Sequence, residues 1–477
     1  MSNEQVPEKR TTVSRSIKSR QLSMIAIGGS IGTGIFFASG NNIASIGPGG
    51  SLVLYIVIGV IVYFMMQCLG EMATNLPISG SFSAYAGRVI DPALGFAFGW
   101  NYWIAWAITI AVEFTAGAAI MTYWIPESVF PGWAWSVIFF VFLLGLNLFS
   151  VKGFAEAEYW FASIKVVVII LVIIVGFLVV FNVFGNSPGV ENWTQTGSDG
   201  TPLKGPFFGG FGGALTAFLV VGYSFQGTEL VGIAAAETDN PAKSIPKAVR
   251  SVFWRLLIFY IGSIVVVAFL IPSSNENLLS YGVEEVAKSP FTLLMKIYEI
   301  PYADHVMNAV VLTSVLSCGN SCMYSASRML YALAKEKQAP KVFTYTSKTG
   351  VPLPALLASA AMGAFSFLCT LIGLNKLYLM LLNASAVMGF IVWLGIAVSQ
   401  YRFRKAWIVQ GRKVEDMKFR SKFYPVAPIV ATVAFIIIIF GANYWTFYPE
   451  FLPFDFVTSY LFIPIFAGLY FGFKFYK

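Results

Sequence analysis

Charge and histidine are scarce in this sequence. Of 477 residues, 11% are charged and one, His305, is a histidine. A soluble domain carries roughly 25% charged residues, so a soluble globule of this size is excluded. Disorder is excluded as well, because 57% of the residues are hydrophobic and 16% are aromatic. A single histidine leaves little material for acid–base catalysis, so we expect no catalytic residues and no enzyme.

Cysteine is also rare, and its pattern excludes two further classes. The four cysteines lie in apolar segments and form no CxxC pair, so we expect neither a disulfide framework nor a metal site, and no cofactor. The net charge of +8 would suggest nucleic acid as a partner of a soluble protein. In a membrane protein the same charge reports topology, and we expect no nucleic-acid binding. The cysteines are Cys68, Cys318, Cys322 and Cys369.

Long apolar segments are what the chain has in abundance. A membrane span needs about 20 mostly apolar residues. Residues 1–20 are polar and lack the apolar stretch of a signal peptide, so we expect a cytoplasmic tail there. The sequence therefore predicts an all-α polytopic membrane protein in a lipid bilayer, with twelve transmembrane helices. We place the spans at about 22–45, 51–75, 93–124, 133–150, 159–182, 208–236, 249–271, 304–334, 353–374, 377–401, 424–444 and 455–475.

The basic residues predict the orientation. With these spans, all but four of the 31 Lys and Arg residues fall on the side of the N-terminus. Cytoplasmic segments of membrane proteins carry an excess of Lys and Arg. We therefore expect both termini in the cytoplasm. The four exceptions are Lys204, Lys288, Lys296 and Lys376.

Two glycine-rich stretches interrupt the first and the sixth span. They are Gly28–Gly34 and Gly222–Glu229. Close helix packing through small residues is one explanation. The other follows from their equivalent places in two five-span halves, because transporters use paired, broken helices there. Freed N–H groups suit a carboxylate and freed carbonyls suit an ammonium group, which predicts a receptor for an amino acid.

Several polar residues lie at membrane depth and need an explanation. Tyr102, Trp106, Thr109 and Glu113 share one face of the third span by their spacing. Glu113 either lies at the site or bonds to a neighbouring helix as a structural acid. Ser317, in the eighth span, either lines a cavity or packs between helices.

Glu229 and Lys165 are the two ionisable residues with the clearest alternatives. Glu229 follows the break in the sixth span, where it could contact substrate, bridge to the other broken helix or carry a proton. Lys165 lies about 9 Å into the fifth span at 1.5 Å per residue. It either extends to the cytoplasmic interface or gains and loses a proton during a cycle.

These motifs resemble the amino acid–polyamine–organocation superfamily, and within it the amino acid permeases. The resemblance covers nearly the whole chain, and two further stretches, Gly153–Phe161 and Gly222–Leu230, look most like the lysine permeases. At Glu113 the chain departs from those permeases, which have an aspartate there. The family segments are Arg20–Phe36, Gly70–Ser81, Gly99–Trp103, Glu237–Pro241, Ile245–Ala248, Ser327–Ala334 and Gly350–Pro352.

The resemblance implies a fold. Two inverted five-span repeats, at about 21–182 and 208–401, would form a transport core at 21–401 with broken helices 1 and 6. A cytoplasmic linker at 402–422 and helices 11 and 12 at 423–477 would follow.

The resemblance also implies a function: proton-coupled import of L-lysine across the bacterial inner membrane. Lys165 would couple the proton, with Glu229, while Tyr223 and Phe225 would gate the site. Alternatives are a permease or exchanger for arginine, an aromatic amino acid or γ-aminobutyrate, or a sensor; the oligomeric state stays open. The expected substrate-binding residues are Ser30, Gly32, Thr33, Gly34, Tyr102, Trp106, Thr109, Glu113, Tyr223, Ser224, Phe225, Gly227, Glu229 and Ser317.

Overall fold

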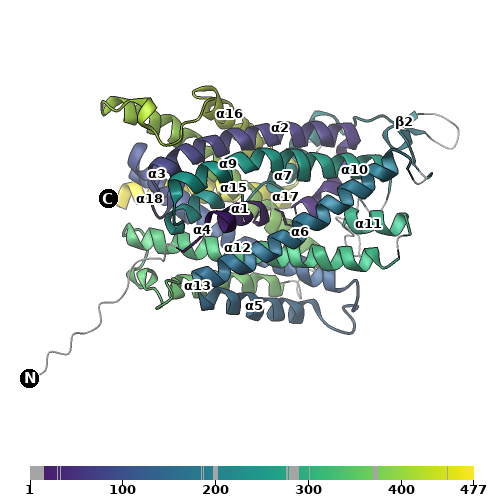
Figure 1. The fold of residues 1–477 in the computed structure, drawn as a ribbon, viewed down its shortest axis with the longest axis horizontal. Helices are drawn as coiled ribbons and strands as arrows, with labels where there is room; N and C mark the ends of the chain where they lie inside the picture. The colour runs from purple at the N-terminus through teal and green to yellow at the C-terminus, as the bar shows by residue number, and fades with distance from the viewer. Residues whose placement is uncertain are drawn as a thin grey trace, which may run out of the picture.

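The structure is a computed structural model, and its helices run mostly along one long axis (Figure 1). The described chain begins and ends at the same end of that axis. Within the described part, the strands are the short antiparallel pair β1 (Gln195–Thr196) and β2 (Pro202–Lys204), which lies at the opposite end. The described residues are 16–29, 31–32, 34–183, 185, 187–196, 202–275, 278, 289–299, 301–368, 374–447 and 450–476.

The first half of the chain contains the first five spans. Span 1 consists of two helical pieces with a break between them, and it joins span 2 at Gly47, where a φ of 83° kinks a continuous helical stretch. Gly47 fits this kink because it has no Cβ to oppose a positive φ. The elements are α1 (Ser19–Gly28), η1 (Gly34–Ala38), α2 (Ser39–Asn75), α3 (Ser81–Val89), α4 (Pro92–Met121), α5 (Gly132–Phe149) and α6 (Val151–Val180).

The second half repeats the pattern of a broken helix followed by four spans. The elements of the sixth to tenth spans are α7 (Gly210–Tyr223), α8 (Leu230–Ala234), η3 (Ala235–Glu237), α9 (Pro241–Arg255), η4 (Leu256–Gly262), α10 (Ser263–Leu270), α11 (Pro290–Ile297), α12 (Ala303–Lys335), η6 (Lys341–Thr344), α13 (Leu353–Ala361), η7 (Met362–Leu368) and α15 (Leu374–Val409). Helices α16 (Val426–Gly441), α17 (Pro453–Tyr460) and α18 (Phe462–Tyr476) follow, and the loops hold short turns η2 (Glu191–Trp193), η8 (Val414–Asp416) and η9 (Tyr444–Thr446).

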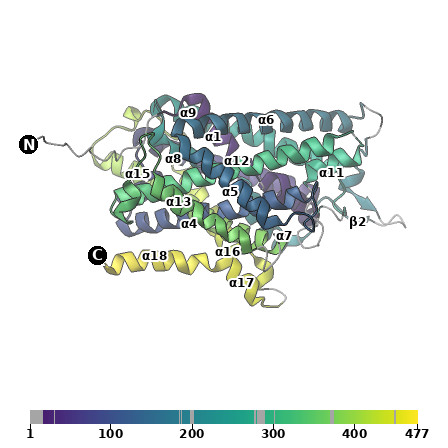
Figure 2. The ribbon, with the colours of Figure 1, turned by 90° about the horizontal axis from the view of Figure 1, so that it is seen from below.

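The twelve predicted spans are therefore confirmed, including the discontinuous first and sixth. Six helices of the described chain are individually long and apolar enough to cross a membrane, and shorter apolar helices supply most of the rest. Helix α18 lies along the outside of the bundle, where Figure 2 shows it at the lower edge. None of its described residues is buried.

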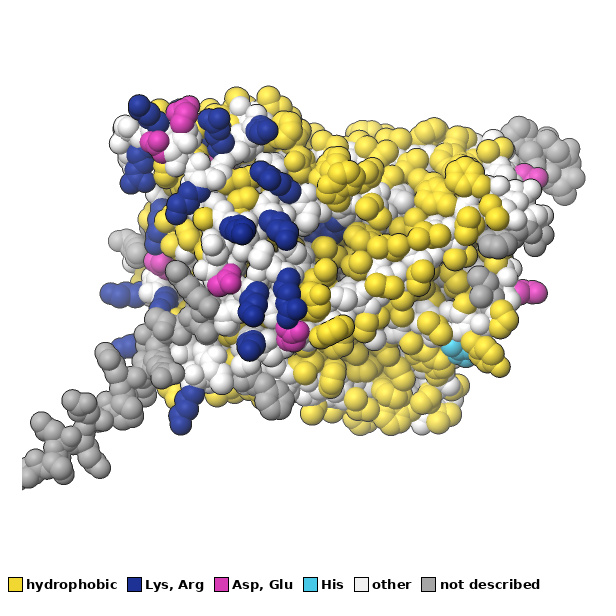
Figure 3. Space-filling view, viewed as in Figure 1, with side chains coloured by type: hydrophobic (Ala, Val, Ile, Leu, Met, Phe, Trp, Pro, Cys, Tyr) yellow, Lys and Arg dark blue, Asp and Glu magenta, His cyan; other side chains and the backbone are white. Residues whose placement is uncertain are grey.

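The surface has the charge distribution that a membrane imposes. In Figure 3 most visible Lys and Arg side chains gather at the end where the described chain begins and ends, which we call the basic end, and a hydrophobic band covers the middle. Two buried ion pairs stabilise the described helices, Glu71 with Arg404 and Glu237 with Arg328. Both pairs join segments that are far apart in the sequence and lie inside the protein.

Candidate functional site

The two broken helices meet in the interior. Helix α1 ends at Gly28 and helical structure resumes at Gly34, while α7 ends at Tyr223 and α8 begins at Leu230. The breaks are so close that a Cβ on Gly34 would lie 2.4 Å from the Cα of Ser224. Glycine is therefore required at position 34 by the approach of two backbones.

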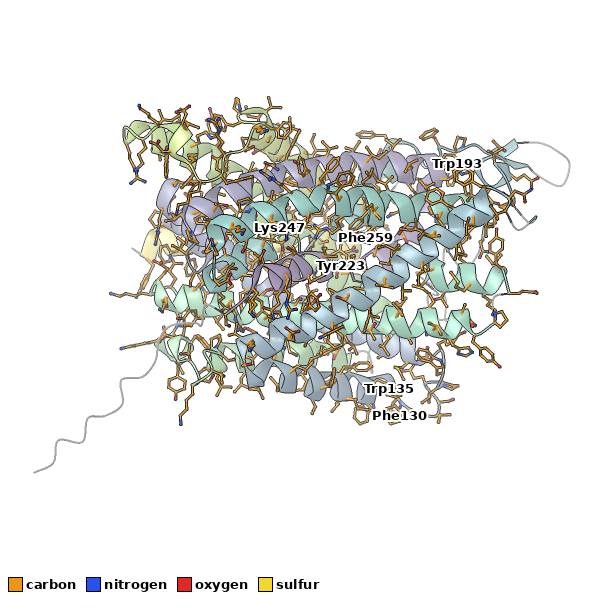
Figure 4. All side chains as sticks on the ribbon, in the orientation of Figure 1. Phe130, Trp135, Trp193, Tyr223, Lys247 and Phe259 are labelled. Atoms are coloured by element: carbon orange, nitrogen blue, oxygen red, sulfur yellow. The ribbon has the colours of Figure 1, made fainter. Side chains whose placement is uncertain are left out.

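A small cavity lies beside this contact, with a volume of about 30 Å³ that the centre of a water-sized sphere can reach. Figure 4 shows Tyr223 near the middle of the long axis, between Lys247 towards the basic end and Trp193 towards the opposite end. The cavity, which Tyr223 lines, therefore lies near the middle of the long axis. Its lining consists of Gly29, Gly32, Gly34, Ala105, Trp106, Thr109, Glu113, Tyr223, Gln226, Glu229, Cys318, Ser385 and Gly389.

Seven of the residues expected at the site line this cavity. They come from span 1, α4 and span 6, so the structure brings together the glycines of the break, the polar face of α4 and Glu229. The seven are Gly32, Gly34, Trp106, Thr109, Glu113, Tyr223 and Glu229.

Five other expected residues lie outside the lining. Tyr102 is buried with its ring centroid 4.7 Å from that of Phe82. Phe225 is buried with its ring stacked on Tyr260, at a centroid distance of 4.1 Å. The remaining three are Ser224, Gly227 and Ser317, whose contacts follow below. Ser30 and Thr33 lie outside the described residues.

The carboxylate of Glu229 is held in place at the cavity wall. Its side chain is 3% exposed. The Gly227 backbone N–H and the Trp393 indole N–H both donate to Glu229 Oε2 at 3.0 Å. The two fixed donors orient this carboxyl group at the cavity wall.

Glu113 faces the break in span 1 from α4. A Cβ on Gly32 would lie 3.8 Å from Glu113 Oε1 and 3.1 Å from Cys318 Sγ, so Gly32 packs between α4 and α12. Glu113 is 1% exposed. The cavity is thus bordered by two acids from different helices, Glu113 and Glu229.

Helix α15 supplies a wall of the cavity that the sequence did not reveal. Ser385 Oγ lies 2.7 Å from Thr109 Oγ1. Gln226, from the span 6 break, donates from Nε2 to the Ala386 carbonyl at 2.8 Å. The polar residues inside the apolar tenth span were the available signal for this wall.

Lys165 is fully buried, so it does not extend to the interface. Its ammonium donates to the carbonyls of Gly28 at 2.5 Å and Ile31 at 2.9 Å. These carbonyls are the ones that the break in span 1 leaves without helical partners. Lys165 therefore holds the broken helix from α6.

Glu158, two helical turns before Lys165, was missed as a functional candidate. It is fully buried and accepts hydrogen bonds from Ser317 Oγ at 2.6 Å and Asn320 Nδ2 at 3.3 Å. A Cβ on Gly28 would lie 2.5 Å from its Oε1. Ser317, which we expected at the substrate, thus donates its hydrogen bond to Glu158.

The two aromatic hydroxyls next to the span 6 break fix its backbone. Tyr260 Oη donates to the Ser224 carbonyl at 2.7 Å, and Tyr55 Oη lies 3.4 Å from Ser224 Oγ. Phe225 packs against both of these rings. The break is therefore a defined turn, held by hydrogen bonds to α2 and η4.

A small hydrogen-bonded network joins segments on the side of the cavity towards the basic end. Glu237, just after α8, accepts hydrogen bonds from Arg328 Nε at 3.1 Å and Tyr324 Oη at 2.9 Å. Ile17 pairs with the same segment, because its N–H donates to the Glu237 carbonyl at 3.1 Å.

Within the described residues, no group of three or more His, Cys, Asp or Glu side chains could hold a metal ion.

Comparison with known proteins places this geometry among transporters. The profile of the amino acid permease family matches residues 21–477. The lysine-specific permease of Escherichia coli is 46% identical, over 99% of this chain and 96% of its own length. The lysine-specific permease of Lactococcus lactis is also 46% identical, over 98% and 90%. A histidine permease of L. lactis is 45% identical, over 98% and 96%.

Proposed function

Since the chain belongs to the amino acid permease family, we propose that it imports L-lysine by secondary active transport, with protons as the coupling ion. The observation that carries the proposal is the small cavity between two broken helices, bordered by two acids. The two relatives named as lysine-specific permeases support the choice of substrate. We place the protein in the bacterial inner membrane, with the basic end and both termini in the cytoplasm.

The substrate binds by its charges. Its carboxylate docks on N–H groups freed in span 1, near Gly32 and Gly34, with Ser30 and Thr33 as further proposed contacts. Its α-ammonium docks at the span 6 break. The side-chain ammonium pairs with Glu229 or Glu113, because a buried cation without a partner costs several kcal/mol. A substrate with a neutral side chain would leave this acid, Glu229 or Glu113, without a partner. The acid would therefore select for a charged side chain.

Alternating access moves the bound lysine inward. Tyr223 and Phe225 close the site from the outer side, and opening towards the basic end requires the network of Glu237, Arg328 and Ile17 to part. Lys165 carries the coupling proton. Release of that proton to the cytoplasm weakens its hold on span 1 and biases the cycle inward.

Uptake into proteoliposomes tests the substrate and the coupling together. Labelled lysine should accumulate in response to an inward proton gradient, and unlabelled lysine should compete better than arginine, histidine or γ-aminobutyrate. Stronger competition by histidine would favour the activity named for the 45% identical relative. Uptake that requires internal amino acid would indicate an exchanger.

Two variants test the assigned residues. Glu229→Gln should abolish lysine uptake, and retained wild-type uptake would remove Glu229 from the mechanism. Lys165→Ala should uncouple uptake from the proton gradient. An unchanged pH dependence in Lys165→Ala would exclude Lys165 as the proton carrier.

A further inference from the structure

A second buried cation holds the broken first helix. Arg255 is the last residue of α9 and is 1% exposed. Its Nη1 donates a hydrogen bond to the carbonyl of Ala26, in the last turn of α1. Its Nε and Nη2 have no hydrogen-bond partner among the described residues. A buried guanidinium with unused donors requires an explanation, because leaving such donors unsatisfied costs about 1–3 kcal/mol or more.

The buried cations of the described chain fall into two kinds. Arg328 and Arg404 pair with acids, Glu237 and Glu71 respectively. Lys165 and Arg255 instead bond to backbone carbonyls at the end of α1. The C-terminal end of a helix carries free carbonyls and a partial negative charge, so cations stabilise it. The end of α1 is therefore capped from two directions, by α6 and by α9.

The two caps differ in chemistry. An ammonium group can lose its proton, whereas a guanidinium stays charged in proteins. Lys165 lies within electrostatic range of Glu158, Glu113 and Cys318. Arg255 lies within electrostatic range of Glu229 and Tyr260. One cap is thus able to switch, and the other is permanent.

We propose that Arg255 is a positioning residue that keeps α1 docked while Lys165 is deprotonated. This rests on the proposed role of Lys165 as the proton carrier. A neutral amine binds the Gly28 and Ile31 carbonyls more weakly than an ammonium does, because charge-assisted hydrogen bonds are about twice as strong. The unused Nε and Nη2 donors of Arg255 then hydrogen-bond to the carbonyls at the end of α1. The helix therefore stays in place while the proton leaves.

Chemical labelling of α1 tests this without measuring transport. Ile25 is fully buried on α1, and an Ile25→Cys reporter is introduced after the native cysteines are replaced. A membrane-impermeant maleimide is applied to the basic end in inside-out vesicles at pH 6 to 9. An Arg20→Cys reporter, at an exposed position of the same helix, corrects for the reagent's own pH dependence.

The proposal predicts a specific pattern. With Arg255 present, corrected labelling should stay low at every pH, also in Lys165→Met. In Arg255→Met, labelling should be low at acid pH and rise at least tenfold as Lys165 loses its proton. In the double variant it should be high throughout.

Two results would overturn the proposal. Low labelling in Arg255→Met at every pH would show that Arg255 does not keep α1 docked. High labelling at every pH would show that it acts as a fixed strut independent of Lys165. Arg255→Gln, which keeps one amide donor, replaces Arg255→Met if the latter does not fold by size-exclusion chromatography. Because the readout does not involve lysine, a wrong substrate assignment would leave it unchanged.

Discussion

Replacing Gly34 by alanine tests the contact between the two broken helices most directly. The added Cβ would lie 2.4 Å from Ser224 Cα and 3.0 Å from Ser224 N. Both are backbone atoms and cannot rotate away, so the breaks must separate by about 1 Å to reach an ordinary contact. Overpacking of this kind costs about 1–3 kcal/mol. At 1.4 kcal/mol per factor of ten, the KM for lysine should rise roughly 5- to 150-fold.

The assay for Gly34→Ala is initial uptake of labelled lysine in proteoliposomes, normalised to protein that elutes as a single species. Gly145→Ala is a matched control, since a Cβ at Gly145 would meet nothing within 4 Å. The control should transport like the wild type. A wild-type KM for Gly34→Ala would refute the inference that substrate binding requires the two breaks to touch.

Two further substitutions address single contacts. Trp393→Phe keeps an aromatic ring but removes the N–H that donates to Glu229 at 3.0 Å. Since hydrogen bonds to charged groups contribute about 1.5–3 kcal/mol, the KM for lysine in uptake kinetics should be at least tenfold higher. An unchanged KM would mean that the indole does not orient the carboxylate. Arg404→Met leaves Glu71 buried without its cation and should lower the free energy of unfolding by about 3–5 kcal/mol. Arg420→Met removes an exposed pair with Glu415 and should lower it by at most about 1 kcal/mol. Equal thermal midpoints for the two variants would contradict this reasoning.

The spans were predictable because the bilayer imposes their length and composition. The predicted eighth span, 304–334, agrees closely with α12 (Ala303–Lys335). The tenth span shows the limit of this reasoning. We predicted 377–401, but α15 continues to Val409, because hydropathy detects the apolar part of a helix and not its extension into water.

The breaks were predictable for a different reason. Glycine weakens a helix at any position, but two glycine-rich stretches at equivalent places in two halves indicate a shared function. What the sequence could not indicate is that Gly34 contacts Ser224, since that depends on how the spans pack. The same holds for Ser385 and Gly389, whose place in the lining follows from the position of α15 beside α4.

Charge counting could not show the surroundings of two basic residues. We counted Lys165 and Arg255 with the cytoplasmic side, and for Lys165 we left open whether its side chain extends to the interface. Both are almost fully buried and bind the carbonyls of α1. Sequence spacing places a residue along its own helix, but it does not show whether a neighbouring helix offers acceptors at that depth.

These two cations also change how the cavity must bind its ligand. The freed carbonyls of a broken helix attract any cation, and the break in span 1 has such carbonyls as well as N–H groups. In the structure, Lys165 and Arg255 already occupy that negative end, through Gly28, Ile31 and Ala26. This occupancy supports our proposal that the substrate's α-ammonium docks at the span 6 break and its side-chain ammonium pairs with an acid. The cavity lining includes two acids, Glu113 and Glu229, and under this proposal a charged side chain is favoured over a neutral one.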